Sequence, residues 1–281
     1  MEYAGAQTKK AENTTGKTAV ITGATGGLGK AFAAECAARG WDLFLTDLSE
    51  SRLALLAGGL SRLYNVEIKY RPCNLADPAA REEFLKSLET DGLQFHFLIN
   101  NAGLDFEGPF TDRTPEELAA VVRLNIEATV AITRWVLKLR DPARTFRILN
   151  VSSLAGFYPM PIKAVYAASK RFLLQFSLAL HWELRDEDVT VTALCPAGMP
   201  SNPQVINSIN AQGFMGRITA KNVGFVAAKA IDRALAGRTV YIPGLLNLFL
   251  SRLGNLVPSS VSAALINKRW REAGKRCTNG N

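Results

Sequence analysis

A tyrosine and a lysine four residues apart carry the clearest chemical signal in the sequence. The segment Tyr166-Ala-Ala-Ser-Lys170 places both side chains on one face of a predicted helix, one turn apart. A phenol has a pKa near 10, so exchanging its proton at neutral pH takes help of roughly 4 kcal/mol. A neighbouring ammonium group gives part of that help because it stabilises the phenolate. The pair predicts acid–base chemistry, although this spacing alone is common by chance.

A serine upstream of this pair adds a hydrogen-bond donor. Ser153 follows the apolar run that ends at Val151, and it stands 13 residues before Tyr166. Ligands of open α/β sheets bind beyond the carboxyl ends of the strands, so a loop can return both residues to one crevice. The surroundings of Ser153 lack a G-x-S-x-G motif, and neither His96 nor His181 stands where a triad would need it. We therefore interpret Ser153 as a ligand of a substrate oxygen and not as a hydrolase nucleophile.

A glycine-rich segment near the N-terminus has the pattern of a phosphate-binding turn. Gly23-Ala-Thr-Gly-Gly-Leu-Gly29 directly follows the strand-like run Thr18–Thr22 and opens a predicted helix. Glycine allows positive φ and close approach of the backbone to a pyrophosphate, and a helix N-terminus offers free N–H groups. With the strand before it and the helix after it, the segment predicts dinucleotide binding.

An acidic residue at the end of the second predicted strand bears on the choice of dinucleotide. Asp47 stands 18 residues after Gly29, where a carboxylate can accept both ribose hydroxyls of NAD and repel a 2′-phosphate. The glycine loop contains no Arg or Lys that would attract that phosphate. We therefore expect NAD(H) in place of NADP(H); the alternative roles for Asp47 are a turn residue or a cap of the helix that follows.

Short β-rich runs alternate with longer amphipathic stretches from Thr18 onward, which is typical of β-α-β units and a parallel sheet. The predicted strands are Thr18–Thr22, Asp42–Thr46, Val66–Arg71, Phe95–Ile99, Phe146–Val151, Val189–Leu194 and Thr239–Ile242. The predicted helices include Gly27–Arg39, Arg52–Leu63, Ala79–Leu88, Pro115–Leu139 and Ala164–Leu184. The fold class is α/β: a single doubly wound Rossmann domain with a seven-stranded parallel sheet and a C-terminal helical extension. We expect a flexible arm over 1–16, the domain over 17–244 with a substrate loop at 196–217, and an apolar, basic extension over 245–281.

Composition excludes several classes of protein. The chain has 281 residues, of which 48% are hydrophobic and 21% charged, so disorder, collagen and coiled coil do not describe its bulk. No apolar run approaches the roughly 18 residues of a membrane span, and the polar N-terminus does not resemble a signal peptide. Four scattered cysteines without a C-x-x-C motif predict a reduced, cytoplasmic protein, and two distant histidines exclude a histidine-rich zinc site. The cysteines are Cys36, Cys73, Cys195 and Cys277.

The net charge of +8 is concentrated toward the C-terminus. We expect this charge to be mostly solvated surface, and we expect no nucleic-acid partner, because neither a recognition motif nor interleaved aromatic and basic residues are present. The segment Leu245–Leu256 is very apolar but too short to cross a bilayer. It could cover a substrate pocket, a dimer surface or a membrane interface, and we expect the membrane least. The basic residues of this region are Arg252, Lys268, Arg269, Arg271, Lys275 and Arg276.

Taken together, these segments resemble the short-chain dehydrogenase/reductase family over Lys17 to Gly244. The resemblance rests on motifs in the family's order: Thr22-Gly23-x-x-x-Gly27-x-Gly29, Asn100-Asn-Ala-Gly103, Asn125, Ser153 and Tyr166-x-x-x-Lys170. It implies an oxidoreductase that interconverts a ketone and a secondary alcohol. It also implies that Tyr166 donates or accepts the proton and that Lys170 holds the nicotinamide ribose and lowers the Tyr166 pKa. Ser153 would then orient the substrate carbonyl.

The resemblance also assigns residues outside this trio. Asn125 would bend its helix to hold a water in a proton relay; the alternative is a polar residue on the surface of a helix. Two positions depart from the family pattern, Asn74 in place of Asp and Ala197 in place of Gly, and the second leaves the nicotinamide contacts of that loop in question. No metal is implied. The implied cofactor-binding residues are Gly23, Thr25, Gly27, Leu28, Gly29, Asp47, Leu48, Asn74, Leu75, Asn101, Ala102, Gly103, Tyr166, Lys170, Pro196, Met199 and Ser201.

The expected substrate pocket is apolar and aromatic, which suits a bulky hydrophobic ketone. The sequence is similar to bacterial hydroxysteroid dehydrogenases, so a 20β- or 17β-type hydroxysteroid activity in steroid metabolism is the main expectation. The alternatives are a 3-oxoacyl or other medium-chain carbonyl reductase and a non-enzymatic dinucleotide-sensing regulator. The helix Ala164–Leu184 is apolar on more than one face, so we expect a homodimer or homotetramer. The predicted substrate-binding residues are Ser153, Leu154, Tyr158, Met160, Met199, Phe214 and Met215.

Overall fold

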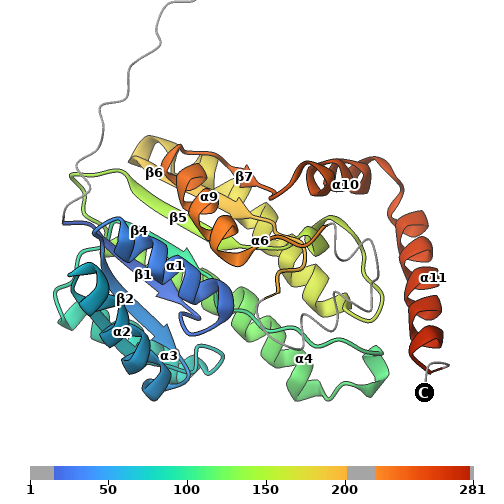
Figure 1. The fold of residues 1–281 in the computed structure, drawn as a ribbon, viewed down its shortest axis with the longest axis horizontal. Coiled ribbons are helices and arrows are strands. Elements are labelled where there is room, and N and C mark those ends of the chain that lie inside the picture. The colour runs from blue at the N-terminus through green and yellow to red at the C-terminus, as the bar shows by residue number, and fades with distance from the viewer. Residues whose placement is uncertain (1–15, 201–218, 279–281) are drawn as a thin grey trace, which may run out of the picture.

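The computed structural model describes residues 16–200 and 219–278, and within them seven strands form one parallel sheet (Figure 1). The strand order is β3-β2-β1-β4-β5-β6-β7, so the chain winds outward in both directions from the β1–β4 pair. The strands are β1 (Thr18–Thr22), β2 (Asp42–Asp47), β3 (Ile68–Pro72), β4 (Phe97–Asn100), β5 (Phe146–Val151), β6 (Val189–Leu194) and β7 (Val240–Tyr241). The predicted doubly wound α/β fold with seven parallel strands is confirmed.

Helices cover both faces of the sheet (Figure 1). One core lies under α1, α2 and α9, and the other lies under α3, α5 and the end of α6. The helices are α1 (Gly27–Ala38), α2 (Glu50–Tyr64), α3 (Pro78–Thr90), α4 (Pro115–Val122), α5 (Thr129–Lys138), α6 (Ala164–Glu183), α9 (Val223–Leu235), α10 (Leu245–Leu256) and α11 (Ser259–Thr278). Short 3-10 turns are η1 (Phe110–Asp112), η3 (Leu154–Phe157) and η4 (Arg185–Glu187).

The strand residues explain why two cores form. Side chains alternate across a strand, so Ile21 enters the core under α1 while its neighbour Val20 enters the opposite core. Leu45 and Phe44 on β2 divide in the same way. Because both faces are covered, the central residues of these strands are apolar on both sides, which is typical of parallel sheets.

The predicted helix over Pro115–Leu139 is interrupted in the structure. It divides into α4, a π-helical segment η2 (Arg123–Ala128) and α5. Thr114 starts α4 with a capping box, in which its hydroxyl accepts from the backbone of Glu117 and the Glu117 carboxylate accepts from the Thr114 backbone. A π-helical turn inside an α-helix is often found at functional sites. Here it contains Asn125, which the sequence analysis singled out.

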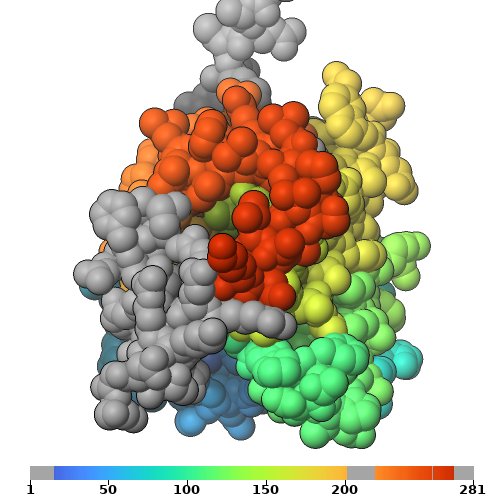
Figure 2. Space-filling model, turned by 90° about the vertical axis from the view of Figure 1, so that its right-hand side faces the viewer, coloured from blue at the N-terminus to red at the C-terminus, as the bar shows by residue number. Residues whose placement is uncertain are grey.

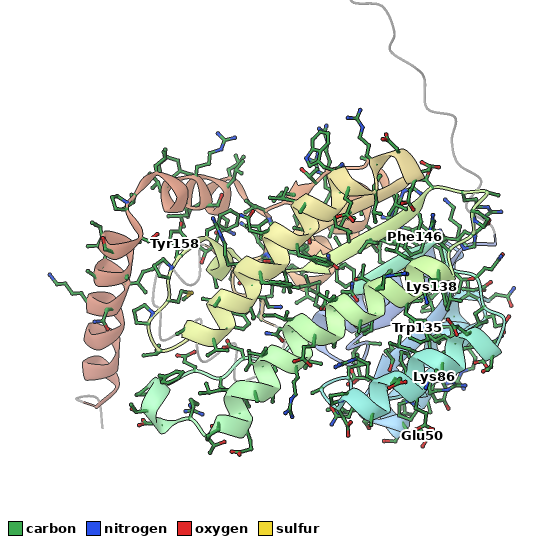
Figure 3. All side chains as sticks on the ribbon, turned by 180° about the vertical axis from the view of Figure 1, so that it is seen from behind. Glu50, Lys86, Trp135, Lys138, Phe146 and Tyr158 are labelled. Atoms are coloured by element: carbon green, nitrogen blue, oxygen red, sulfur yellow. The ribbon has the colours of Figure 1, made fainter. Side chains whose placement is uncertain are left out.

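The C-terminal extension consists of α10 and α11, which project from the body of the fold (Figure 1). Tyr158 anchors α10, because its hydroxyl donates a hydrogen bond to the carbonyl oxygen of Leu250 (Figure 3). Gly254 allows the close approach, since a Cβ there would lie 2.6 Å from the Tyr158 ring. Within residues 16–200 and 219–278, no helix is long and apolar enough to cross a membrane.

Candidate active site

The glycine-rich turn between β1 and α1 is shaped by contacts that only glycine permits. Gly23 has φ of +63°, and a Cβ there would lie 2.8 Å from the Cα of Ala102. A Cβ on Gly29 would lie 2.1 Å from the carbonyl oxygen of Gly23. The first turn of α1 therefore packs directly on the loop, and its N-terminal N–H groups are left at the carboxyl end of the sheet.

The motif after β4 holds this glycine turn in place. The side-chain amide of Asn101 donates to the carbonyl oxygens of Thr22 at 3.0 Å and Gly23 at 2.9 Å. In return, the Thr22 hydroxyl accepts from the backbone N–H groups of Asn101 and Ala102, both at 3.0 Å. The two segments that the sequence analysis identified separately thus form one braced unit.

A cavity of about 390 Å³ lies beside this unit. It is lined by the glycine turn, the end of β2, the segment after β3 and the motif after β4, so most of the predicted cofactor residues meet around one space. Gly29 lies behind the turn and does not line it. The lining residues are Gly23, Thr25, Gly26, Gly27, Leu28, Asp47, Leu48, Arg52, Cys73, Asn74, Leu75, Asn101, Ala102, Gly103, Leu104 and Leu124.

Asp47 is oriented by hydrogen bonds from both sides. Its Oδ2 accepts from the backbone N–H of Thr25 at 2.8 Å and from the Thr25 hydroxyl at 2.7 Å, and its Oδ1 accepts from the Leu48 N–H at 2.7 Å. A carboxylate has about four acceptor positions, so one remains for a ligand. The alternative that Asp47 caps the next helix is wrong, because Ser49 is the N-cap of α2 and accepts from the N–H of Arg52.

Tyr166 and Lys170 lie together at the end of β5. The buried ammonium of Lys170 donates to the carbonyl oxygen of Val151 at 2.8 Å and lies 5.6 Å from the centre of the Tyr166 ring. Burial lowers the pKa of Lys170 to about 8. Burial raises the pKa of Tyr166, the charge of Asp105 raises it further, and a hydrogen bond with Ser153 lowers it. The structure therefore brings the predicted catalytic trio together.

Ser153 is fixed by the turn that follows β5. Its hydroxyl accepts from the N–H of Ala155 at 3.1 Å and caps the 3-10 turn η3. The carbonyl oxygen of Pro196 accepts from the Leu154 N–H at 2.8 Å, so the segment after β6 packs on this turn. Ser153 is thus held on the same side of the sheet as Tyr166.

Asn125 is completely buried, so the alternative of a polar residue on a helix surface is wrong. Its Oδ1 accepts from the N–H of Leu104 at 2.8 Å, and its amide donates to the Leu104 carbonyl at 3.0 Å and to the Ser169 hydroxyl at 2.9 Å. A Cβ on Gly103 would lie 3.4 Å from this Oδ1 and 3.2 Å from the Lys170 ammonium. Asn125 therefore ties the loop after β4 to the helix that carries the tyrosine.

Sequence reasoning missed a charged cluster beside the tyrosine. The ammonium of Lys163 lies 2.6 Å from Asp105, 2.9 Å from Glu107 and 5.8 Å from the centre of the Tyr166 ring. Burial opposes the charge of Lys163, but the two carboxylates outweigh it and raise its pKa. The sequence did contain an indication of this cluster. Lys163 stands one helical turn before Tyr166, and both acids come shortly after the Asn100–Gly103 motif.

A strained residue precedes this cluster. Ile162 has φ of +61°, which is an outlier for a β-branched side chain. Its carbonyl oxygen accepts from the N–H of Gly108 at 2.9 Å, so the strained turn is fastened to the acidic loop. Strain of this kind persists where the surrounding structure enforces it, and it often marks functional sites.

The predicted substrate residues divide among different places. Tyr158 and Met160 line a groove of about 730 Å³ under the C-terminal helices, which neither Ser153 nor Tyr166 lines. Met199 packs on the core under α1 and α9. The remaining predicted residues of this loop, Ser201, Phe214 and Met215, lie outside the described residues.

Comparison with known proteins places this site in context. The family model for short chain dehydrogenase matches residues 17–210, which is more than half of the chain. The very-long-chain 3-oxoacyl-CoA reductase of Anas platyrhynchos is 35% identical over 190 residues, covering 64% of this chain and 59% of that protein. The chain therefore spans about three fifths of the length of this relative.

Solved structures show the same fold. A 7β-hydroxysteroid dehydrogenase has a TM-score of 0.81 over 90% of this chain and 97% of its own, at 23% identity, which is a likeness of fold alone. A short-chain dehydrogenase from Sphingobium yanoikuyae in complex with NADPH has a TM-score of 0.73 at 28% identity, covering 85% of this chain and 94% of that one.

Proposed function

The chain belongs to the short-chain dehydrogenase family, and from that premise we propose that it interconverts a carbonyl compound and its secondary alcohol with a nicotinamide dinucleotide. One observation carries the proposal. The buried Lys170 ammonium lies 5.6 Å from the Tyr166 ring, and Tyr166 hydrogen-bonds Ser153. A regulator that only senses a dinucleotide would not need this trio, so the enzymatic interpretation is favoured.

The residues around the 390 Å³ cavity fit a dinucleotide. Glycine backbone and the N-terminus of α1 line one wall, which suits a pyrophosphate. The Asp47 carboxylate is held at the far end by Thr25, where a ribose would bind. Asn101 and Gly103 line the side that leads toward Lys170. When bound, the nicotinamide supplies the hydride.

The side chains of this chain then handle the proton and the carbonyl. The Ser153 hydroxyl donates a hydrogen bond to the carbonyl oxygen and fixes its position. The Tyr166 hydroxyl donates its proton to that oxygen as negative charge develops there, and the Lys170 ammonium stabilises the resulting phenolate. In alcohol oxidation the same groups act in reverse, with the Tyr166 phenolate accepting the proton.

We propose NAD(H) as the preferred cofactor. The support is Asp47, whose oriented carboxylate would repel the 2′-phosphate of NADP. Arg52 lines the same cavity and offers a positive charge outside the glycine turn, which the sequence analysis did not weigh. The structural relative from Sphingobium yanoikuyae carries NADPH. Parallel assays with NADH and NADPH therefore test the proposed preference for NAD(H).

We propose a 3-oxoacyl thioester or a related carbonyl on an apolar chain as the substrate. The curated relative is a 3-oxoacyl-CoA reductase at 35% identity, whereas the likeness to the hydroxysteroid enzyme is one of fold alone. The comparisons thus favour the alternative from the sequence analysis over its main expectation of a 20β- or 17β-type hydroxysteroid dehydrogenase. The apolar lining around η3 suits either an acyl chain or a steroid.

We also keep the expectation of a cytoplasmic homo-oligomer as a proposal. Cys36, Cys73 and Cys195 are free, buried thiols, which supports a reducing compartment. Phe172 and Trp182 on α6 are exposed at 38% and 62%, and such an apolar helix face suits a second copy of the chain.

The experiment follows the absorbance of the reduced nicotinamide with NADH or NADPH in parallel. The substrates are acetoacetyl and longer 3-oxoacyl thioesters, a 17-ketosteroid and a 20-ketosteroid. We expect NADH-dependent reduction of the thioesters. Turnover of a ketosteroid alone would overturn the substrate proposal, and preference for NADPH would overturn the role of Asp47. Absence of turnover in both directions with carbonyl and alcohol panels would overturn the enzymatic proposal.

A further inference from the structure

The C-terminal helix α10 buries two polar side chains and exposes several large apolar ones. Its polar residues Asn247 and Ser251 face the body and are buried, at 1% and 2% exposure. Its apolar residues Leu245, Phe249 and Leu256 face outward, at 87%, 57% and 78% exposure. The outward residues recur at helical spacing and form one face.

The inward face of α10 is held by polar contacts. The amide of Asn247 donates to the carbonyl oxygens of Thr219 at 3.0 Å and Pro243 at 2.7 Å. The hydroxyl of Ser251 donates to the Leu248 carbonyl at 2.7 Å. The bond to Thr219, together with the bond from Tyr158 to Leu250, ties α10 to other segments and leaves its exposed apolar residues outward.

Helix α11 repeats the arrangement. Ser262 is buried at 5% exposure, whereas Val261 and Leu265, four residues apart, are exposed at 47% and 62%. Helix α11 lies at the edge of the molecule, away from the sheet (Figure 1), and Figure 2 looks onto this end. We call the outward residues Leu245, Phe249, Leu253, Leu256, Val261 and Leu265 the outer apolar face.

The same part of the chain carries most of its net positive charge. Residues 245–281 contain six basic residues and one acidic residue, Glu272, a net +5 of the chain's +8. Five of the six basic residues lie between Lys268 and Arg276, directly after the outer apolar face. Apolar residues on one side of a helix with a cluster of basic residues beside them are typical of segments that lie in the interface of an anionic bilayer.

A groove beneath α10 and α11 separates these helices from the turn η3 and the start of α6. It has a volume of about 730 Å³ and runs from Phe157 and Met160 to Leu256 and Val257, with Arg171 as its one charged residue among the described residues. Apolar surface therefore continues from the outer apolar face toward the segment that follows Ser153.

We propose that α10 and α11 dock on an anionic phospholipid surface, with the outer apolar face in the acyl region and the basic residues at the phosphates. A second copy of the chain is the other possible occupant. The charge favours lipid. A two-fold contact through α10 and α11 would bring two segments, each with a net charge of +5, to the same interface. The proposal goes beyond the enzymatic function and does not depend on it.

The test measures binding of the purified chain to sedimented vesicles, without cofactor or substrate. Vesicles contain phosphatidylcholine alone or phosphatidylcholine with phosphatidylglycerol. We expect binding only to the anionic vesicles, weakening as salt is raised. The variant with Leu245→Ser and Leu256→Ser should bind about tenfold or more weakly. Each substitution removes an apolar side chain that the acyl region would bury.

Two further variants make the result specific. Leu55→Ser with Leu63→Ser removes leucines of similar exposure, 78% and 70%, from α2 on the body of the fold, and it should bind as the unchanged chain does. Lys275→Gln with Arg276→Gln should bind more weakly and with less dependence on salt. Far-ultraviolet circular dichroism of every variant confirms that it is folded.

Three results would overturn the proposal. The first is no binding of the unchanged chain to anionic vesicles. The second is an equal loss of binding in the α2 control. The third is dissociation of an oligomer by Leu245→Ser with Leu256→Ser, seen by sedimentation, in a chain that does not bind vesicles; the outer apolar face would then be an interface between copies.

Discussion

Lys170 lies against the ring of Tyr166, with its ammonium 5.6 Å from the ring centre and 2.8 Å from the carbonyl oxygen of Val151 at the end of β5. The lysine is thus fixed to the end of β5 by a hydrogen bond and lies beside the ring of Tyr166. Because it is buried, its charge is costly, and its pKa is lowered to about 8. A lysine with this pKa changes its protonation state just above neutral pH.

The first prediction concerns the pH dependence of reduction. Below a pH of about 8 Lys170 is charged and supports proton donation by Tyr166, and above it the charge is lost. We expect kcat/KM for carbonyl reduction to fall as the pH rises through about 8, because this parameter reports groups of the free enzyme. Lys170→Arg keeps a positive charge at this position, so any residual activity should not show this fall as the pH rises through about 8. A profile that stays level to about pH 10 would contradict the assignment.

The second prediction concerns the cluster beside the tyrosine. Lys163→Met leaves Asp105 without its counter-charge, so the pKa of Tyr166 should rise further. Alcohol oxidation needs the phenolate, so the pH at which its rate rises should move upward. Adding Asp105→Asn should move it back. Lys229→Met, which removes a lysine paired with Asp232 on α9, is the control and should leave the profile unchanged. An equal shift in that control would show that net charge alone is responsible.

The order of elements and the motifs were predictable because both are local. Alternating runs fix which residues enter each core, and the glycine turn needs only the strand before it and the helix after it. Local residue patterns did not predict the interruption at η2, and only the resemblance implied that Asn125 bends its helix. Asn125 is drawn inward by Leu104 and Ser169, which are distant in the sequence. A continuous helix over Pro115–Leu139 was therefore expected where the structure has a π-helical turn.

Contacts between distant segments account for the other differences. The cluster of Lys163 with Asp105 and Glu107 depends on how the loop after β4 folds onto α6. Periodicity identified Leu245–Leu256 as apolar, but only the hydrogen bonds of Asn247 decide which face is buried. Tyr158 was expected at the substrate, whereas its hydroxyl donates to Leu250 on α10.

The third prediction concerns the glycine turn. In Gly29→Ala the new Cβ would lie 2.1 Å from the Gly23 carbonyl oxygen, so the turn must shift. We expect the free energy of unfolding to fall by about 1–3 kcal/mol and dinucleotide binding to be lost. Gly58→Ala in α2 has open space around it and is the control, which should gain up to about 1 kcal/mol. Chemical denaturation and fluorescence titration with NADH measure both effects. Unchanged stability and binding in Gly29→Ala would contradict the packing described for the turn.

The fourth prediction concerns stability and a half-buried histidine, His96. Burial lowers the pKa of His96, whose Nδ1 accepts from the N–H of Thr18 at 2.9 Å and whose Nε2 lies 3.2 Å from Asp141. The unfolded chain binds the proton more readily, so the free energy of unfolding should fall as the pH drops below 6.5. In His96→Asn, the free energy of unfolding should depend less steeply on pH in this range. Denaturation at pH values on both sides of 6.5 measures it. The same slope in His96→Asn would assign the effect to other groups.

The most direct test of the central claim is Tyr166→Phe, assayed for turnover and for cofactor binding on the same preparation. The substitution removes one hydroxyl among many cofactor contacts, so NADH binding by fluorescence titration should be weakened far less than turnover. Carbonyl reduction should fall by about 10²–10⁴-fold, because the proton donor is lost. Tyr70→Phe on the edge strand β3 is the control and should keep full activity. Turnover of Tyr166→Phe within about twofold of the unchanged chain would contradict the account, since proton transfer would then not depend on this residue.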